Sequence, residues 1–117
     1  DFLQDDLPTG FDMVMFCDVG PFTVPLFRKI HDSLSPNGRL VIVEQFARDK
    51  NTAAPSRLLW SFLSSLEYPA ERNNFTTLDL VQTRLRQAGF RDFVTTSVPY
   101  NDHLRWNTDW IMLAARK

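Results

Sequence analysis

Residues 34–44 read LSPNGRLVIVE, a Ser-Pro-Asn-Gly turn followed directly by an apolar, β-branched run. The run from Arg39 to Glu44 is typical of a strand, and the turn before it marks a boundary between two elements. Upstream, residues 11–19 read FDMVMFCDV, a nearly continuous apolar run between a Pro-Thr-Gly turn and a Gly-Pro pair. Because its apolar residues do not alternate with polar ones, this run predicts a strand buried on both faces.

The segment between these two runs has the pattern of a helix. Its apolar face recurs at Val24, Phe27, Ile30 or His31, and Leu34. Thr23 is the predicted N-cap, and Pro25 falls in the first turn, where a missing N–H is tolerated. Strand, helix and strand within about 35 residues predict a βαβ unit, a right-handed crossover between two parallel strands.

The second half of the chain predicts two more helices and a hairpin. Residues Ser56–Leu66 are predicted to form a helix that is apolar around more of its circumference than one core contact requires, and Trp60 lies off its main face. Thr76–Asp79 resembles a capping box, and Gly89 stands where a residue following a helix C-terminus belongs. The predicted helix between them carries its apolar face at Leu78, Val81, Leu85 and Ala88.

Two strand-like segments, 90–100 and 106–116, are joined by residues 101–105, a connection too short for a crossover. The predicted fold is therefore α/β, in the order β-α-β-α-α-β-β, with parallel strands and a C-terminal antiparallel hairpin.

Composition narrows the function classes. The 117 residues are 44% hydrophobic and 23% charged, which indicates one globular domain. With 13 basic and 14 acidic residues, the chain has no charged block suited to nucleic acid or to a membrane surface. The single cysteine, Cys17, lies in an apolar run as a small core residue does, and it suits a reducing cytoplasm. The first ten residues have no secretion signal and read as the continuation of a longer chain.

Ligands of open parallel sheets bind beyond the carboxyl ends of the strands, which directs attention to Asp18 and Glu44. Glu44 either accepts a hydrogen bond from a ligand or marks where its strand meets water. Asp18 either lets the backbone approach a ligand or belongs to an ordinary strand-to-helix turn. No glycine-rich phosphate-binding motif is present.

The two histidines are separated from any second metal-binding side chain, so no metal site is expected. His31 falls on or beside the inner face of the first helix, which favours a structural role. His103, in the hairpin loop with Asp102 and Arg105, is the one weak candidate for a catalytic group, and the ordinary reading is an exposed loop histidine.

Four segments, in this order, resemble one family: Asp1-Phe2; residues 7–14, LPTGFDMV; residues 34–44, LSPNGRLVIVE; and residues 75–90, FTTLDLVQTRLRQAGF. Together they look like the second half of a class I S-adenosylmethionine (SAM)-dependent methyltransferase, most like the small-molecule O-methyltransferases. The third segment is similar to the family's entry to its fifth strand, and the fourth to the helix before its sixth.

The resemblance implies that residues 1–117 are a single partial domain, the C-terminal half of a Rossmann-like methyltransferase domain. They would hold strands 4 to 7 of a sheet ordered 3-2-1-4-5-7-6. Strands 1 to 3, with the glycine-rich SAM loop, would be missing. The cofactor positions that carry over are Asp1 and Phe2, beside the adenine, and Phe16, Cys17 and Asp18, at the end of strand 4.

The family's histidine base after strand 4 has no counterpart, because residues 18–22 read DVGPF. The expected function is the C-terminal portion of an enzyme that methylates a small molecule, inactive alone and without tight SAM binding. The alternative is a non-catalytic α/β interaction module. Either reading predicts a homodimer, through the strand edge Asp12–Phe16 or the Ser56–Leu66 helix.

Overall fold

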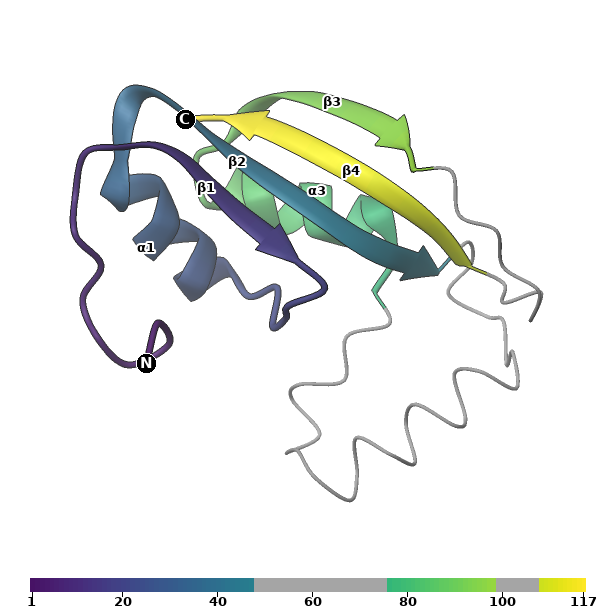
Figure 1. Cartoon of the computed structure of the whole chain (residues 1–117), viewed down its shortest axis with the longest axis horizontal. Helices are drawn as coiled ribbons and strands as arrows, with labels where there is room; N and C mark the ends of the chain where they lie inside the picture. The colour runs from purple at the N-terminus through teal and green to yellow at the C-terminus, as the bar shows by residue number, and fades with distance from the viewer. Residues whose placement is uncertain (48–75, 99–107) are drawn as a thin grey trace.

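The computed structural model describes residues 1–47, 76–98 and 108–117, which form a sheet with two helices against one face (Figure 1). Its elements are β1 (Phe11–Cys17), α1 (Val24–Ser33), β2 (Leu34–Ala47), α3 (Leu78–Gln87), β3 (Arg91–Ser97) and β4 (Thr108–Arg116). The predicted mixed α/β class is confirmed. The predicted helix Ser56–Leu66, with Trp60, lies outside the described residues. No helix in the described ranges is long and apolar enough to cross a membrane.

The four strands lie in the order β1-β2-β4-β3. β1 runs parallel to β2, and β4 runs antiparallel to both β2 and β3. β4 therefore lies between two strands that precede it in the chain, and β1 and β3 are the edges of the described sheet (Figure 1).

α1 begins where its cap was predicted. Thr23 has an extended backbone, and its hydroxyl accepts a hydrogen bond from the Leu26 N–H at 3.4 Å. Pro25 lies in the first turn. The helix ends at Ser33, whose hydroxyl donates to the Ile30 carbonyl at 2.7 Å.

β2 is longer than the predicted strand because pairing with β1 starts before the turn. Leu34 pairs with Phe11 and Arg39 pairs with Met13, so residues 35–38 form an irregularity within the strand rather than a break before it. Glycine is required at position 38. A Cβ there would lie 2.9 Å from the Phe11 carbonyl oxygen and 2.9 Å from the Leu34 Cβ, closer than such atoms pack.

The N-cap of α3 lies one residue later than the predicted N-cap. Thr77, not Thr76, is the N-cap, and its hydroxyl accepts from the Leu80 N–H at 3.4 Å. Asp79 is therefore in the second helical position rather than the third, where a capping-box side chain reaches back to the cap. The cause is that Thr77 takes the extended backbone that a cap needs.

The C-terminus of α3 forms a Schellman motif, in which the Phe90 N–H donates to the Leu85 carbonyl and the Gly89 N–H to the Arg86 carbonyl, both at 3.0 Å. Gly89 has φ +101°, which confirms the predicted position. His31 lies against it: a Cβ at position 89 would be 3.1 Å from the His31 Nε2. The His31 ring also meets the Phe90 ring edge-on at 5.3 Å, so this histidine packs against the end of α3, as its predicted structural role requires.

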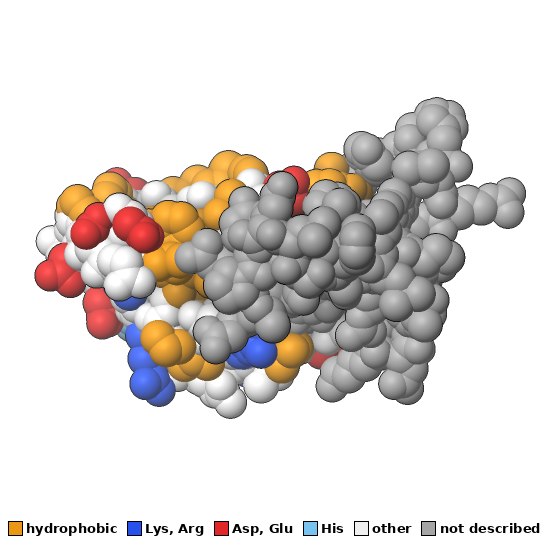
Figure 2. Space-filling view, turned by 90° about the horizontal axis from the view of Figure 1, so that it is seen from below, with side chains coloured by type: hydrophobic (Ala, Val, Ile, Leu, Met, Phe, Trp, Pro, Cys, Tyr) orange, Lys and Arg blue, Asp and Glu red, His pale blue; other side chains and the backbone are white. Residues whose placement is uncertain are grey.

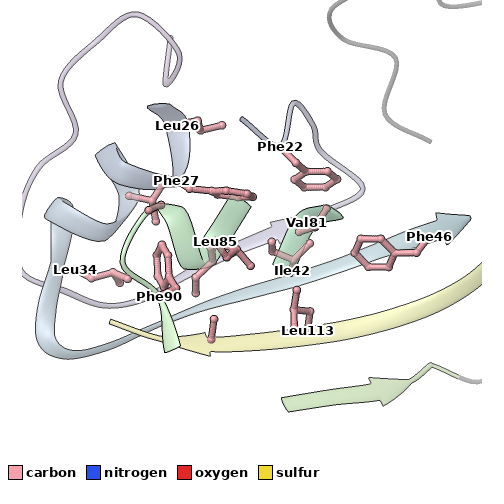
Figure 3. Close-up of a cluster of buried hydrophobic side chains, with 14 residues drawn as sticks. Phe22, Leu26, Phe27, Leu34, Ile42, Phe46, Val81, Leu85, Phe90 and Leu113 are labelled. Carbon is pink, nitrogen blue, oxygen red and sulfur yellow. The ribbon is translucent and has the colours of Figure 1, made fainter. Parts of the chain in front are cut away.

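The core lies between the two helices and the sheet (Figure 3). Phe27 and Ile30 of α1, Val81 and Leu85 of α3, and Ile42 of β2 are each at most 1% exposed. Burying side chains of this size stabilises a fold by about 1.5–3 kcal/mol each, so this contact holds the helices on the sheet.

The prediction that the first strand is buried on both faces is wrong. Met13 and Met15 are 53% and 56% exposed, because no described element covers the sheet face opposite the helices. The same alternation corrects the prediction for Cys17, which is exposed rather than part of the core. Val14 and Phe16 point to the helix side and pack against the core.

Candidate functional site

Two carboxylates meet at the carboxyl ends of β1 and β2. Pairing of these strands continues past β1, since the Asp18 N–H donates to the Val43 carbonyl at 2.9 Å. This register sets Asp18 beside Glu44, where its negative charge acts on the Glu44 carboxyl. Asp18 has φ +53°, an uncommon backbone conformation for a non-glycine residue. Asp18 and Glu44, which were selected separately from the sequence, therefore lie in one site.

Glu44 lies in the helix-facing row of β2, between the buried side chains of Ile42 and Phe46, and only 8% of its surface is exposed. The pKa of the Glu44 carboxyl is raised from 4.5 to about 7, chiefly by burial and in smaller part by the negative charge of Asp18. The Gln45 N–H donates to its Oε1 at 3.0 Å and acts in the opposite direction. A carboxyl with such a pKa exchanges a proton readily near neutral pH.

An apolar groove of about 430 Å³ runs beside β1, between the N-terminal segment and α1. Its lining includes Phe2, Leu7, Phe16, Val19, Leu26 and Ile30. The rings of Phe2 and Phe16 meet at 6.2 Å between centroids, tilted by 55°. Figure 2, which views the molecule from below, shows hydrophobic side chains reaching the surface beside acidic ones. The groove therefore offers aromatic and aliphatic surface to a ligand.

The N-terminal segment is tied to this groove. The Lys29 Nζ of α1 donates to the Phe2 carbonyl at 3.2 Å, and the Asp1 carboxylate accepts from the Leu3 N–H at 2.9 Å. The Asp1 amino group pairs with Asp5 within the same turn. These contacts hold Phe2 over Phe16 although the segment has no helix or strand of its own.

The five predicted cofactor residues divide into three groups. Phe2 and Phe16 line one groove, with Asp1 next to Phe2 at the start of the segment. Asp18 lies beside Glu44, while Cys17, between Phe16 and Asp18 in a strand, faces the opposite side. The weak catalytic candidate His103, with Asp102 and Arg105, lies outside the described residues.

Two side chains near the site were not selected from the sequence. Phe22, 1% exposed, stacks on Phe46 at 6.4 Å, and the Arg84 Nη1 of α3 donates to the Phe22 carbonyl at 2.9 Å. In the sequence, Phe22 is only one more apolar residue and cannot be distinguished from other core residues. Arg84 is separated from its partner by 62 residues, so its local pattern contains no sign of the contact.

Several solved structures with a similar arrangement of elements are methyltransferases. Human N-acetylserotonin methyltransferase in complex with SAM matches 100% of the chain with TM-score 0.68 and 23% identity. PigF with SAH matches 100% with TM-score 0.73 and 18% identity. Haemonchus contortus phosphoethanolamine N-methyltransferase 2 matches 97% with TM-score 0.69 and 16% identity. No protein-family model and no curated protein matches the sequence.

The chain thus has the fold of SAM-dependent methyltransferases, and the resemblance seen in the sequence is confirmed at the level of the fold. It spans about a third of the length of the structures it matches: 32% of the human enzyme, 33% of PigF and 34% of the Haemonchus enzyme. This share fits a fragment of a methyltransferase domain.

Proposed function

We propose that the chain is the C-terminal portion of a SAM-dependent methyltransferase whose parent transfers a methyl group to a small-molecule acceptor. The observation that carries the proposal is the match of the whole chain to one third of such enzymes. Residues 1–117 would form one partial domain with the order β-α-β-α-α-β-β, including the helix Ser56–Leu66. A reducing cytoplasm is the proposed compartment, in keeping with the free thiol of Cys17.

In the parent enzyme, SAM would supply a methyl group activated for nucleophilic attack. The cofactor residues proposed for it are Asp1, Phe2, Phe16, Cys17 and Asp18. The paired rings of Phe2 and Phe16 suit a flat heteroaromatic group, and carboxylates can accept hydrogen bonds from amino or hydroxyl groups. Cys17 would contribute only its backbone, because its side chain faces away. These residues fit one part of the cofactor and leave the rest to the missing segment.

Glu44 is proposed to take the acceptor's proton. With its pKa raised to about 7, Glu44 is ionised in part near neutral pH, and an acceptor hydroxyl can transfer its proton to this carboxylate as its oxygen gains the methyl group. Glu44 then returns the proton to water. This role would replace the histidine base that the family resemblance leads one to expect and that the sequence lacks.

Calorimetric titration with SAM tests the proposal. The isolated chain is expected to show no micromolar binding, because it lacks the glycine-rich loop. A polypeptide that joins the preceding coding sequence to this chain is expected to bind SAM. There, Phe16→Ala should weaken binding about tenfold through loss of an aromatic contact, equivalent to about 1.4 kcal/mol.

Val94→Ala is the matched control, since Val94 is 62% exposed and lies on β3, at the other edge of the sheet. Micromolar binding by the isolated chain would show that the missing segment is dispensable. Absence of binding by the joined polypeptide would overturn the SAM-dependent function itself.

The alternative proposal is a non-catalytic interaction module, and the exposed edge of β1 favours it. β1 is an edge strand of the described sheet, and Met13 and Met15 leave apolar surface beside that edge, a combination that recruits other chains. Either function is proposed to include a homodimer, formed through the Asp12–Phe16 edge or the Ser56–Leu66 helix.

Light scattering of the concentrated chain should give the mass of a dimer. If the β1 edge forms the contact, Met15→Lys should give the mass of a monomer, because pairing would bury the added charge. Met112→Lys serves as control, because Met112 is 37% exposed and lies on β4, which β2 separates from β1. A dimer that survives Met15→Lys would favour the helix route, and a monomeric wild-type chain would contradict both.

A further inference from the structure

The loop between β1 and α1 is anchored at three described points. At its start, the Asp18 N–H donates to the Val43 carbonyl at 2.9 Å. At its end, the Phe22 ring packs between the rings of Phe27 and Phe46, at 6.2 and 6.4 Å. The third anchor is the hydrogen bond from the Arg84 Nη1 to the Phe22 carbonyl at 2.9 Å. Each anchor comes from a different part of the chain.

The Arg84 contact differs from the other two because it is polar and directional. Phe22 is 1% exposed, so its carbonyl has little access to water and needs a donor from the protein. A guanidinium donates charge-assisted hydrogen bonds from a planar, rigid group. The stacked rings restrain the side chain of Phe22, whereas Arg84 restrains its backbone.

The backbone at Phe22 determines how the loop returns to α1. Asp18 and Phe22 are the two ends of one short loop, and both ends approach β2 beside Glu44: Asp18 by its side chain, and Phe22 by stacking on Phe46, two residues beyond Glu44. Displacement of the Phe22 carbonyl would therefore release the loop that holds Asp18 in its positive-φ conformation against Glu44.

We infer that Arg84 is a positioning residue, which holds the β1–α1 loop so that Asp18 stays bonded to β2 beside Glu44. Its catalytic consequence rests on the proposed function, whereas the positioning itself is a property of the described fold. In the described residues, the groups that act on the Glu44 carboxyl are Asp18, from the end of β1, and the Gln45 N–H of β2; its β4 partner is the uncharged Ile111.

Hydrogen exchange of the Asp18 amide in the purified chain gives the first test. Arg84→Met is expected to speed this exchange about tenfold, because the Asp18–Val43 hydrogen bond opens more often when the loop is released. Arg84→Lys should restore part of the protection. Arg86→Met is the matched control: Arg86 is on the same helix, but it is exposed and lies over the Phe93 ring at 4.8 Å.

Carbon-13 NMR titration of the Glu44 carboxyl in the same variants gives the second test. Loss of the Asp18 contact and entry of water should both lower the Glu44 midpoint in Arg84→Met, by about half a pH unit or more, and leave it unchanged in Arg86→Met. If Arg84→Met does not fold, the amide exchange and the Glu44 titration are both measured in Arg84→Lys instead.

Unchanged Asp18 exchange in a folded Arg84 variant would overturn the inference. A wild-type Glu44 that titrates near its ordinary pKa of 4.5 would instead overturn the proton-accepting role in the proposed function, and the amide exchange would still decide the role of Arg84.

Discussion

Replacing Glu44 with glutamine is expected to stabilise the folded chain by about 3 kcal/mol at pH 8 and to change its stability little at pH 4. The folded-state pKa of Glu44 is raised from 4.5 to about 7. Below pH 4.5 the carboxyl is protonated in both folded and unfolded chains. Between the two values the unfolded chain loses this proton first, so the stability of the wild-type chain falls as the pH rises through this range.

Chemical unfolding at several pH values measures this difference. Asp18→Asn should give part of the gain, because it removes a neighbouring negative charge but leaves Glu44 buried. Asp6→Asn, at an exposed position, should change stability by no more than about 0.5 kcal/mol at either pH. If Glu44→Gln destabilises the chain equally at pH 4 and pH 8, Glu44 acts as a hydrogen-bond acceptor instead.

Phe27→Ala is expected to reduce the free energy of unfolding by about 3–5 kcal/mol, the largest effect of any substitution considered. The Phe27 ring is fully buried and stacks on Phe22 at 6.2 Å, with an interplanar angle of 20°. Removing it leaves a cavity between α1, α3 and the sheet. Urea unfolding followed by circular dichroism measures the loss.

Phe2→Ala is the control for removal of the same side chain, and it should cost about 1 kcal/mol or less because Phe2 is 40% exposed. If Phe27→Ala is too unstable to measure, Phe27→Leu, which keeps most of the volume, should remain folded with a smaller loss. A Phe27→Ala variant no less stable than Phe2→Ala would contradict the packing of α1 on the sheet.

Local structure was predictable where a few neighbouring residues determine it. Thr23 and Gly89 were placed correctly because a cap and a Schellman turn depend on hydrogen bonds within one helical turn. The shift of the α3 cap to Thr77 arose because two adjacent threonines offer equivalent hydroxyls. The exposure of β1 was missed because an apolar run carries no information on which neighbours cover its faces.

The site was predictable only in part for the same reason. Asp18 and Glu44 could each be selected as the end of a strand, but their contact depends on the register between β1 and β2. The bond from Arg84 to the Phe22 carbonyl depends on how α3 packs, and a main-chain acceptor has no sequence signature. Side chains that act through distant backbone groups were therefore invisible before the fold was known.

The place of β4 in the sheet has a consequence for biosynthesis. β4 is the last described strand to leave the ribosome, yet it is the only described neighbour of β3 and one of the two neighbours of β2. During translation, β3 emerges before its described partner, and one side of β2 lacks its described neighbour until the nine residues of β4 follow. A nascent chain stalled before Thr108 would therefore present the β4-facing edges of β2 and β3 to chaperones.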